Sequence, residues 1–288
     1  MTFLKHTFYS YINGRYLRDG KISINDLGLL RGYGVSDSTR TYQGKLFHIS
    51  QHLFRLRSSA KALGLKIKNS DEEIKKITYN LIRLNDIKEA DVKYIVTGGI
   101  SLDNFMPTKS SSFFIQVKPF YPFPQSYYSK GIDIITYTYE RFLPKCKTLN
   151  YIPGISILHQ AKEKKAKETL YLSNDGRILE GATSNFFAFR GNTLITAHRD
   201  ILFGITRQVV LEIAKKHFSI EERDIKKEEI VSFDEAFITG NNKEIMPVIC
   251  IDGEKIQDKK VGEKTKKLMH LFRSYTQKDP WPKLSLPF

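Results

Sequence analysis

The sequence is poor in cysteine and has no long apolar run. Its 288 residues include two cysteines, Cys146 and Cys250, too few for a disulfide framework or a cysteine-based metal cluster. The longest apolar runs fall far short of the roughly 18 residues that a membrane-spanning helix needs. The first residues, 1–6, lack the basic-then-apolar pattern of an export signal. We therefore expect a cytoplasmic protein with no metal site and no membrane segment.

Basic residues outnumber acidic ones, but the sequence does not gather them into a stripe. The net charge is +15, and lysines occur in runs interleaved with glutamate, as in residues 162–165 and 226–229. This pattern is typical of solvated helix faces. A nucleic-acid-binding protein is expected to show a segregated basic stripe or a recognisable module, and the sequence has neither. We expect no nucleic-acid partner, and at most a mild attraction for anionic substrates.

The first part of the chain alternates strand and helix patterns. Asn13-Gly14 lies between two short β-type runs and predicts a hairpin turn, because both positions of a type I′ turn need positive φ. Ser50 is the expected N-cap of a first helix, and Gly64 is expected just beyond its end. Residues 70–73 form a capping box that begins a second helix. Two strands, near 92–97 and 113–117, follow.

A proline cluster at residues 119–124 marks the expected domain junction. Beyond it the patterns are mostly strands, with helices expected over 155–167, 206–217 and 262–275. The sequence therefore predicts an α+β protein of two domains, since 288 residues can bury one large core or two modest ones. The expected division is a small α/β domain over 1–118, a linker over 119–128 and a larger domain over 129–288.

Three features of the sequence together indicate one kind of chemistry. Lys147 lies between a β-type run and a helix pattern, where a lysine can project into a cavity and act as a nucleophilic amine. Glu180 closes one strand pattern just before another begins, and a glycine turn at Gly204 opens the helix that follows. An amine, a buried carboxylate and helix-start amides are what pyridoxal phosphate requires for its aldehyde, its ring nitrogen and its phosphate.

The order of these motifs resembles the class IV, or fold type IV, pyridoxal-phosphate-dependent aminotransferases. This family includes branched-chain and D-amino acid aminotransferases and aminodeoxychorismate lyase. The resemblance runs from about Phe8 to Phe272. It implies a D-amino acid aminotransferase-like fold, with a smaller α/β sandwich as N-terminal domain and a larger β-barrel-like C-terminal domain flanked by helices. It also implies pyridoxal 5′-phosphate as cofactor and a homodimer as the assembly.

The resemblance assigns cofactor roles to residues near the amine and the carboxylate. Lys147 matches the catalytic lysine, which forms the Schiff base with the cofactor and moves the α-proton of the substrate. Tyr151 matches a tyrosine near the phenolic oxygen of the cofactor. Glu180 matches the carboxylate that faces the pyridine nitrogen. Thr183 and Asn185 occupy positions that line the cofactor in relatives, although both could equally be turn residues.

The same resemblance assigns three segments to the phosphate. Arg55 stands in the family motif His-x-x-Arg-Leu, whose arginine grips the phosphate. Ile205 and Thr206 begin a helix and offer amides and a hydroxyl group. Asn241 departs from the family pattern, because relatives have a Ser/Thr-rich turn at this point. The amides of Asn241 and Asn242 are still expected to bind phosphate and the substrate carboxylate.

Substrate-binding positions depart further from the family. Ser36 replaces the aromatic residue of the family motif Gly-x-Gly-Val-aromatic-Glu, which suggests a larger or more polar pocket. The strand ending at Thr97 is followed by Gly98, where D-amino acid enzymes carry an arginine for the substrate carboxylate. Its absence argues against a D-amino acid substrate. The arginine-bearing segment with which branched-chain enzymes bind 2-oxoglutarate is also not recognisable.

The leading prediction is an aminotransferase that moves an amino group between an amino acid, of the L-branched-chain or aliphatic class, and a 2-oxo acid such as 2-oxoglutarate. Aminodeoxychorismate lyase is the first alternative, and the positive charge would suit its dianionic substrate slightly better. A D-amino acid aminotransferase is the second. A catalytically idle binding protein on the same fold is disfavoured because Lys147 and Glu180 are both present.

Overall fold

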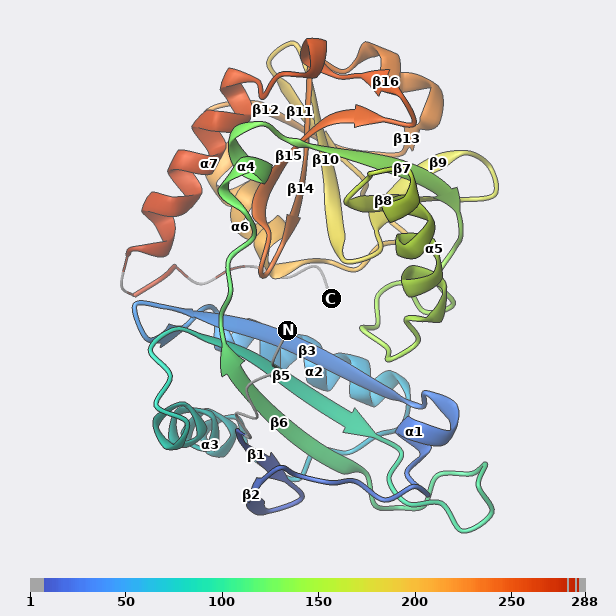
Figure 1. Ribbon diagram of the computed structural model, residues 1–288, viewed down its shortest axis with the longest axis vertical. Coiled ribbons are helices and arrows are strands. Elements are labelled where there is room, and N and C mark those ends of the chain that lie inside the picture. Colours follow the sequence, from blue (N-terminus) through green and yellow to red (C-terminus); the bar gives the residue numbers. More distant parts are fainter. Residues whose placement is uncertain (1–7, 279, 283, 285–288) are drawn as a thin grey trace. The chain divides into compact units, whose positions relative to one another are not determined.

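The computed structural model describes residues 8–278, 280–282 and 284, and the chain forms two compact units (Figure 1). The first unit consists of residues up to 121 together with 146–150, and the second of residues 122–145 and those from 151 onward. The sequence analysis placed 146–150 in the second domain. They join the first unit because Leu149 donates its N–H to the carbonyl of Gly34 (2.9 Å) and Thr148 bridges to Val35.

The first unit is a six-stranded antiparallel sheet in the order β2-β1-β6-β5-β3-β4. The predicted hairpin turn is confirmed, since Asn13 and Gly14 have φ of 46° and 94°. The elements are β1 (Tyr9–Ile12), β2 (Arg15–Arg18), α1 (Leu27–Arg31), β3 (Gly34–Tyr42), β4 (Lys45–Leu46), α2 (Ile49–Ala62), α3 (Asp71–Leu84), β5 (Ala90–Thr97) and β6 (Ser112–Pro119).

Helices α2 and α3 share one apolar core with this sheet. Leu53 and Leu56 of α2 and Ile74 of α3 belong to the same buried cluster as residues of β3, β5 and β6. The capping box that begins α3 at Ser70 is confirmed. The predicted N-cap of α2, Ser50, was wrong. The helix begins directly after His48, at Ile49. The left-handed backbone of His48 (φ 43°) directs its carbonyl to the amides of the first turn, so Ser50 lies inside the helix.

The second unit is built on a ten-stranded mixed sheet. Its elements are α4 (Gln125–Ser129), β7 (Ile132–Thr138), α5 (Ile152–Glu163), β8 (Glu168–Leu172), β9 (Arg177–Gly181), β10 (Ser184–Arg190), β11 (Thr193–Thr196), α6 (Ile205–Ala214), β12 (Ser219–Glu222), β13 (Ile225–Lys226), η1 (Lys227–Ser232), β14 (Glu235–Gly240), β15 (Glu244–Ile251), β16 (Glu254–Lys255), η2 (Gln257–Lys259) and α7 (Glu263–Thr276). The short strands β12, β13 and β16 were not predicted.

Six of these strands close into a barrel. The order β10-β14-β15-β7-β8-β9 returns to β10, because Glu180 of β9 pairs with Asn185 of β10. Alternate apolar residues of all six strands form one buried cluster inside it, as expected from the two-residue period of a strand. Examples are Phe186 and Ala188 of β10 and Ile238 of β14. Closure leaves the strands of the ring without free edges.

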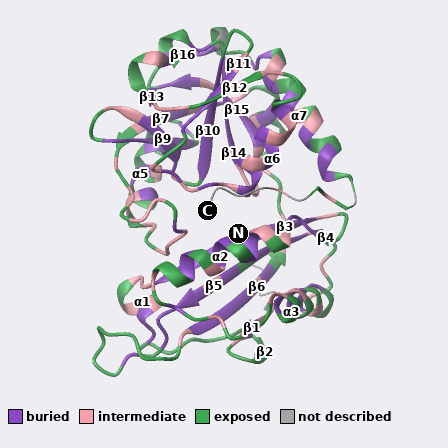
Figure 2. Ribbon diagram, turned by 180° about the vertical axis from the view of Figure 1, so that it is seen from behind, coloured by how far each residue is buried: buried purple, intermediate pink, exposed green. Residues whose placement is uncertain are grey.

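Helices pack on the outside of this barrel. Helix α5 contacts β7 and β8, whereas α6 and α7 contact each other and the strands β14 and β15. Figure 2 shows the barrel strands largely buried and α7 carrying both buried and exposed residues. The predicted α+β class, with a sandwich-like first domain and a barrel-like second domain flanked by helices, is confirmed. Across the described residues, the helices are too short or too polar to cross a membrane.

Candidate active site

In the first unit, Lys147 is held by its backbone beside β3 and α2. Its N–H donates to the hydroxyl oxygen of Ser59 (3.2 Å), and its carbonyl accepts the N–H of Ser36 (2.8 Å). Both of these partners are buried, and the position of Lys147 is therefore fixed on two sides. The structure thus brings together Lys147 and Ser36, which the sequence analysis named for the catalytic amine and for substrate binding.

Arg55 is oriented by a buried carboxylate. Its Nε and Nη2 donate to the two oxygens of Asp37 (2.7 and 2.9 Å), and His52 Nδ1 lies 2.7 Å from Asp37 Oδ1. Burial raises the pKa of Asp37, but the charges and hydrogen bonds of Arg55 and His52 outweigh it and hold that pKa well below its usual range. The sequence analysis missed Asp37 as the shared partner of Arg55 and His52. The structure gives Arg55 one fixed orientation.

The stability of the first unit is expected to fall as the pH falls from about 6.5 towards 4. Burial and the nearby charge of His52 lower the pKa of His48 from 6.5 to about 4. The unfolded chain therefore takes up a proton that the folded chain refuses, and protonation favours unfolding throughout this range. Urea unfolding at a series of pH values measures the slope. His48→Asn, which suits the left-handed backbone, should make that slope shallower, with His52, whose pKa burial also lowers, accounting for the remainder; an unchanged slope would contradict the assignment.

Thr97 and Gly98, predicted to bind substrate, have structural contacts. The Thr97 hydroxyl group donates to the buried Asp26 (3.0 Å), which accepts the Gly28 N–H (2.8 Å) at the start of α1. A Cβ on Gly98 would lie 2.7 Å from the ring of Tyr33. The geometry therefore shows Thr97 holding α1 and Gly98 packed against an aromatic ring.

In the second unit, strand pairing aligns three polar side chains at the point where the barrel closes. Glu180 of β9 pairs with Asn185 of β10, which pairs in turn with Thr239 of β14. The Glu180 side chain is buried and accepts the Leu202 N–H (3.0 Å) and the Asn185 amide (3.4 Å). A buried carboxylate needs such partners, because an unpaired one is too costly to bury.

The charged partner of Glu180 is Arg141, which the sequence analysis missed. Arg141 Nη1 donates to Glu180 Oε1 (2.8 Å) and to the carbonyl of Pro144 (3.1 Å). Burial lowers the pKa of Arg141, but the Glu180 carboxylate raises it above its ordinary value. The pair thus joins the buried Glu180 side chain to a guanidinium, and a carboxylate is the group that can pair with a protonated ring nitrogen. Arg141 lies outside the helices and strands, where no periodic sequence pattern could have indicated which way its side chain points.

The glycine turn before α6 lies against the same cluster. Asn185 donates to the Leu202 carbonyl (2.7 Å), and a Cβ on Gly204 would fall 2.2 Å from the Asn185 side-chain oxygen. Glycine is therefore required where the chain enters the helix. Ile205 and Thr206 follow as the first residues of α6, both buried. Amides at a helix start favour an anion.

Two further turns carry the remaining predicted residues of this unit. Thr183 lies between β9 and β10, and a Cβ on Gly240 would come within 3.2 Å of its carbonyl. Asn241 and Asn242 follow Gly240, and the Asn241 amide donates to the Asn242 side-chain oxygen (2.8 Å). The two turns are thus neighbours, next to the row formed by Glu180 and Asn185. Tyr151, also in this unit, precedes α5.

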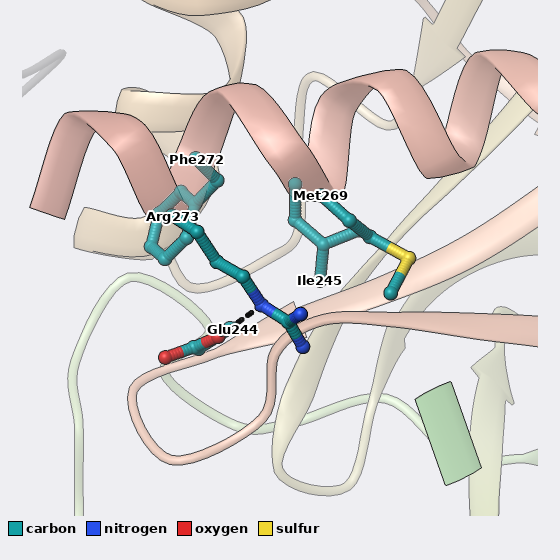
Figure 3. A pocket seen from close by; sticks show the side chains of 5 residues that line it. All are labelled: Glu244, Ile245, Met269, Phe272 and Arg273. Carbon is teal, nitrogen blue, oxygen red and sulfur yellow. Dashed lines mark ion pairs between the residues drawn. The ribbon is translucent and has the colours of Figure 1, made fainter. Parts of the chain in front are cut away.

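A separate hollow lies between α7 and the start of β15 (Figure 3). Arg273 of α7 reaches across it toward Glu244, with 3.8 Å between Nε and Oε2. The predicted site residues all belong to the described part of the chain, and none of them lines this hollow. Its lining residues are Glu244, Ile245, Met269, Phe272 and Arg273.

The chain is similar to known proteins along most of its length. Residues 34–251 match the family model described as amino-transferase class IV. A Methanocaldococcus jannaschii protein whose name assigns it branched-chain-amino-acid aminotransferase activity is 34% identical over 281 residues, covering 93% of this chain and 96% of that protein. A D-alanine aminotransferase of Staphylococcus epidermidis is 31% identical over 282 residues, covering 93% and 97%.

A solved structure of the branched-chain amino acid aminotransferase of Escherichia coli has a TM-score of 0.90 to this chain at 25% identity, covering 97% of this chain and 99% of that one. Three observations point to the same family: the barrel with its buried glutamate paired to an arginine, the family match and these relatives. The chain is an enzyme of the class IV aminotransferase family.

Proposed function

We propose that the enzyme is a pyridoxal-phosphate-dependent aminotransferase acting on an L-amino acid of the branched-chain or aliphatic class and on a 2-oxo acid such as 2-oxoglutarate. The observation that carries this proposal is the buried side chain of Glu180, which pairs with Arg141 at 2.8 Å. A protonated pyridine nitrogen is the partner that such a carboxylate suits. The 34% identity to the M. jannaschii protein supports the branched-chain class.

Taken unit by unit, the residues present suit this cofactor. Glu180 would hold the ring nitrogen, while the amides at the start of α6, with Thr206, suit the phosphate. Arg55 has five N–H donors, so a guanidinium that bonds Asp37 can also serve an anion. When bound, the cofactor supplies an electron sink for negative charge at the substrate α-carbon. Lys147 would bind the cofactor through its amine and move the proton at that carbon.

Packing around Gly98 supports an L-amino acid as substrate. D-amino acid enzymes of the family carry an arginine at this position, as the resemblance implies. Here even a Cβ would lie 2.7 Å from the Tyr33 ring and 3.0 Å from Leu27. The ring cannot easily move, because the Tyr33 hydroxyl group donates to the Leu63 carbonyl (2.5 Å). A carboxylate-binding arginine therefore has no room at this position.

Replacing Gly98 by arginine is expected to destabilise the enzyme without giving it activity on D-alanine. Overpacking of this kind typically costs about 1–3 kcal/mol in the free energy of unfolding. Urea unfolding and assays with D-alanine and L-isoleucine measure both effects. Thr108→Arg, which adds the same charge on an exposed residue, is the matched control. A stable Gly98→Arg variant that gained D-alanine activity would show that the argument from packing is wrong.

The direct test of the function is visible absorption during addition of single substrates. We expect a yellow protein whose band bleaches with L-isoleucine or L-glutamate and returns with a 2-oxo acid. Bleaching with D-alanine alone would show that the substrate is a D-amino acid and not an L-amino acid. A band that persists while aminodeoxychorismate yields pyruvate would establish the lyase. A colourless protein that cannot be reconstituted with pyridoxal phosphate would remove the whole proposal.

We also propose a homodimer in the cytoplasm, on the family resemblance. Sedimentation at assay concentration tests the assembly, and a monomer there would count against it.

A further inference from the structure

An ion pair between a half-buried lysine and a buried carboxylate joins two turns of the second unit. Lys243 ends the turn between β14 and β15, and its Nζ lies 2.9 Å from Oε2 of Glu168. Glu168 is 1% exposed and also accepts hydrogen bonds from two hydroxyl groups, that of Thr183 (2.8 Å), between β9 and β10, and that of Ser184 (3.3 Å), the first residue of β10. Lys243 Nζ donates to the Thr183 hydroxyl oxygen as well. One lysine side chain therefore ties two separate turns to one buried carboxylate.

The turn between β14 and β15 is held on its other side too. The Lys243 N–H donates to the Gly240 carbonyl (3.1 Å) and closes the turn. The next residue, Glu244, has a left-handed backbone (φ 54°), and its carboxylate faces Arg273 of α7 (Figure 3). Lys243 thus binds the end of the turn to Glu168 of β8, and Glu244 binds the next position to Arg273 of α7.

The side chains of this turn bond to each other, and its backbone N–H groups can bind an anion. The family's Ser/Thr-rich turn is replaced by two asparagines, and the amide of Asn241 donates to the side chain of Asn242. Backbone N–H groups of the turn would contribute to an anion site, and their directions depend on how well the turn is ordered. Whatever fixes the turn therefore fixes the anion site.

We propose that Lys243 is a positioning residue, which latches the turn at Asn241–Asn242 onto Glu168 and Thr183 so that its backbone amides are set for the cofactor phosphate. This inference rests on the proposed function. Lys243 acts through the turn and does not itself bind the phosphate. Its amine is already committed to the buried carboxylate of Glu168.

The test compares two ligands that differ only in the phosphate. In Lys243→Met, the dissociation constant of pyridoxamine 5′-phosphate is expected to rise about tenfold or more, as for loss of a buried charged hydrogen bond, whereas that of pyridoxamine stays within about threefold. Hydrogen exchange at residues 240–244 of the cofactor-free protein should accelerate. Lys243→Arg keeps the charge and should retain most of the affinity. Lys266→Met, which removes an exposed lysine paired with Glu263, is the control and should change nothing.

A double variant tests whether Lys243 acts through Glu168. Adding Lys243→Met to Glu168→Gln should weaken phosphate-dependent binding no further, because the Glu168 substitution has already removed the ion pair that holds the turn. The inference is overturned if Lys243→Met binds both ligands as the parent does, or loses both equally. Failure of the parent itself to bind pyridoxamine 5′-phosphate would instead overturn the proposed function, and the inference with it.

Discussion

Replacing Lys147 by alanine is expected to lower turnover by about 10⁴-fold or more, because the variant loses both the amine that binds the cofactor and the base that moves the α-proton. The purified variant should lack the yellow band that depends on the Lys147 amine. Single-turnover measurements with L-isoleucine, followed by absorption, would separate loss of chemistry from loss of binding.

The same substitution is expected to leave the fold in place. The hydrogen bonds that join this segment to Ser59 and Ser36 are made by backbone atoms of Lys147, which alanine retains. Lys145→Ala, at an exposed lysine two residues earlier, is the matched control and should keep full turnover. A yellow, active Lys147→Ala protein would show that another amine carries the reaction.

Much of the fold follows from local patterns. Strand patterns beyond the proline cluster predict most strands of the barrel, and turn and capping motifs predict the hairpin at Asn13 and the start of α3 at Ser70. These signals need no knowledge of distant residues. The segment around Lys147 was assigned to the wrong unit, because its partners Ser36 and Ser59 lie about a hundred residues earlier in the chain.

The ionic partners at the candidate site could not be predicted. Glu180 and Lys147 were named from motif order, but Arg141 and Lys243 are ordinary basic residues in a chain with 46 of them. What distinguishes these two is a buried carboxylate within 3 Å, which only the closure of the barrel and its turns supplies. Asp37 was also not predicted as an ionic partner. Its partner Arg55 lies on a different element, helix α2, and only the packing of α2 on β3 brings the two side chains together.

Glu180→Gln is expected to impair the enzyme in two ways that can be separated. Glutamine keeps the shape of the side chain but removes the charge, so Arg141 loses its buried counter-ion. Breaking such a pair costs about 3–5 kcal/mol when the remaining charge has no other partner, and less here because glutamine can still accept a hydrogen bond. Turnover should fall by about 10²–10³-fold, the usual effect of removing one electrostatic contact to a reacting group.

A second substitution tells the two effects apart. In the double variant Arg141→Met with Glu180→Gln, no unpaired charge is left, so the free energy of unfolding should recover towards that of the parent. Turnover should stay low, because no carboxylate is present to hold the ring nitrogen. Urea unfolding and steady-state kinetics on the same preparations give both quantities. If turnover recovered together with stability, Glu180 would be only a counter-ion for Arg141, and the acid that serves the cofactor would have to be sought elsewhere.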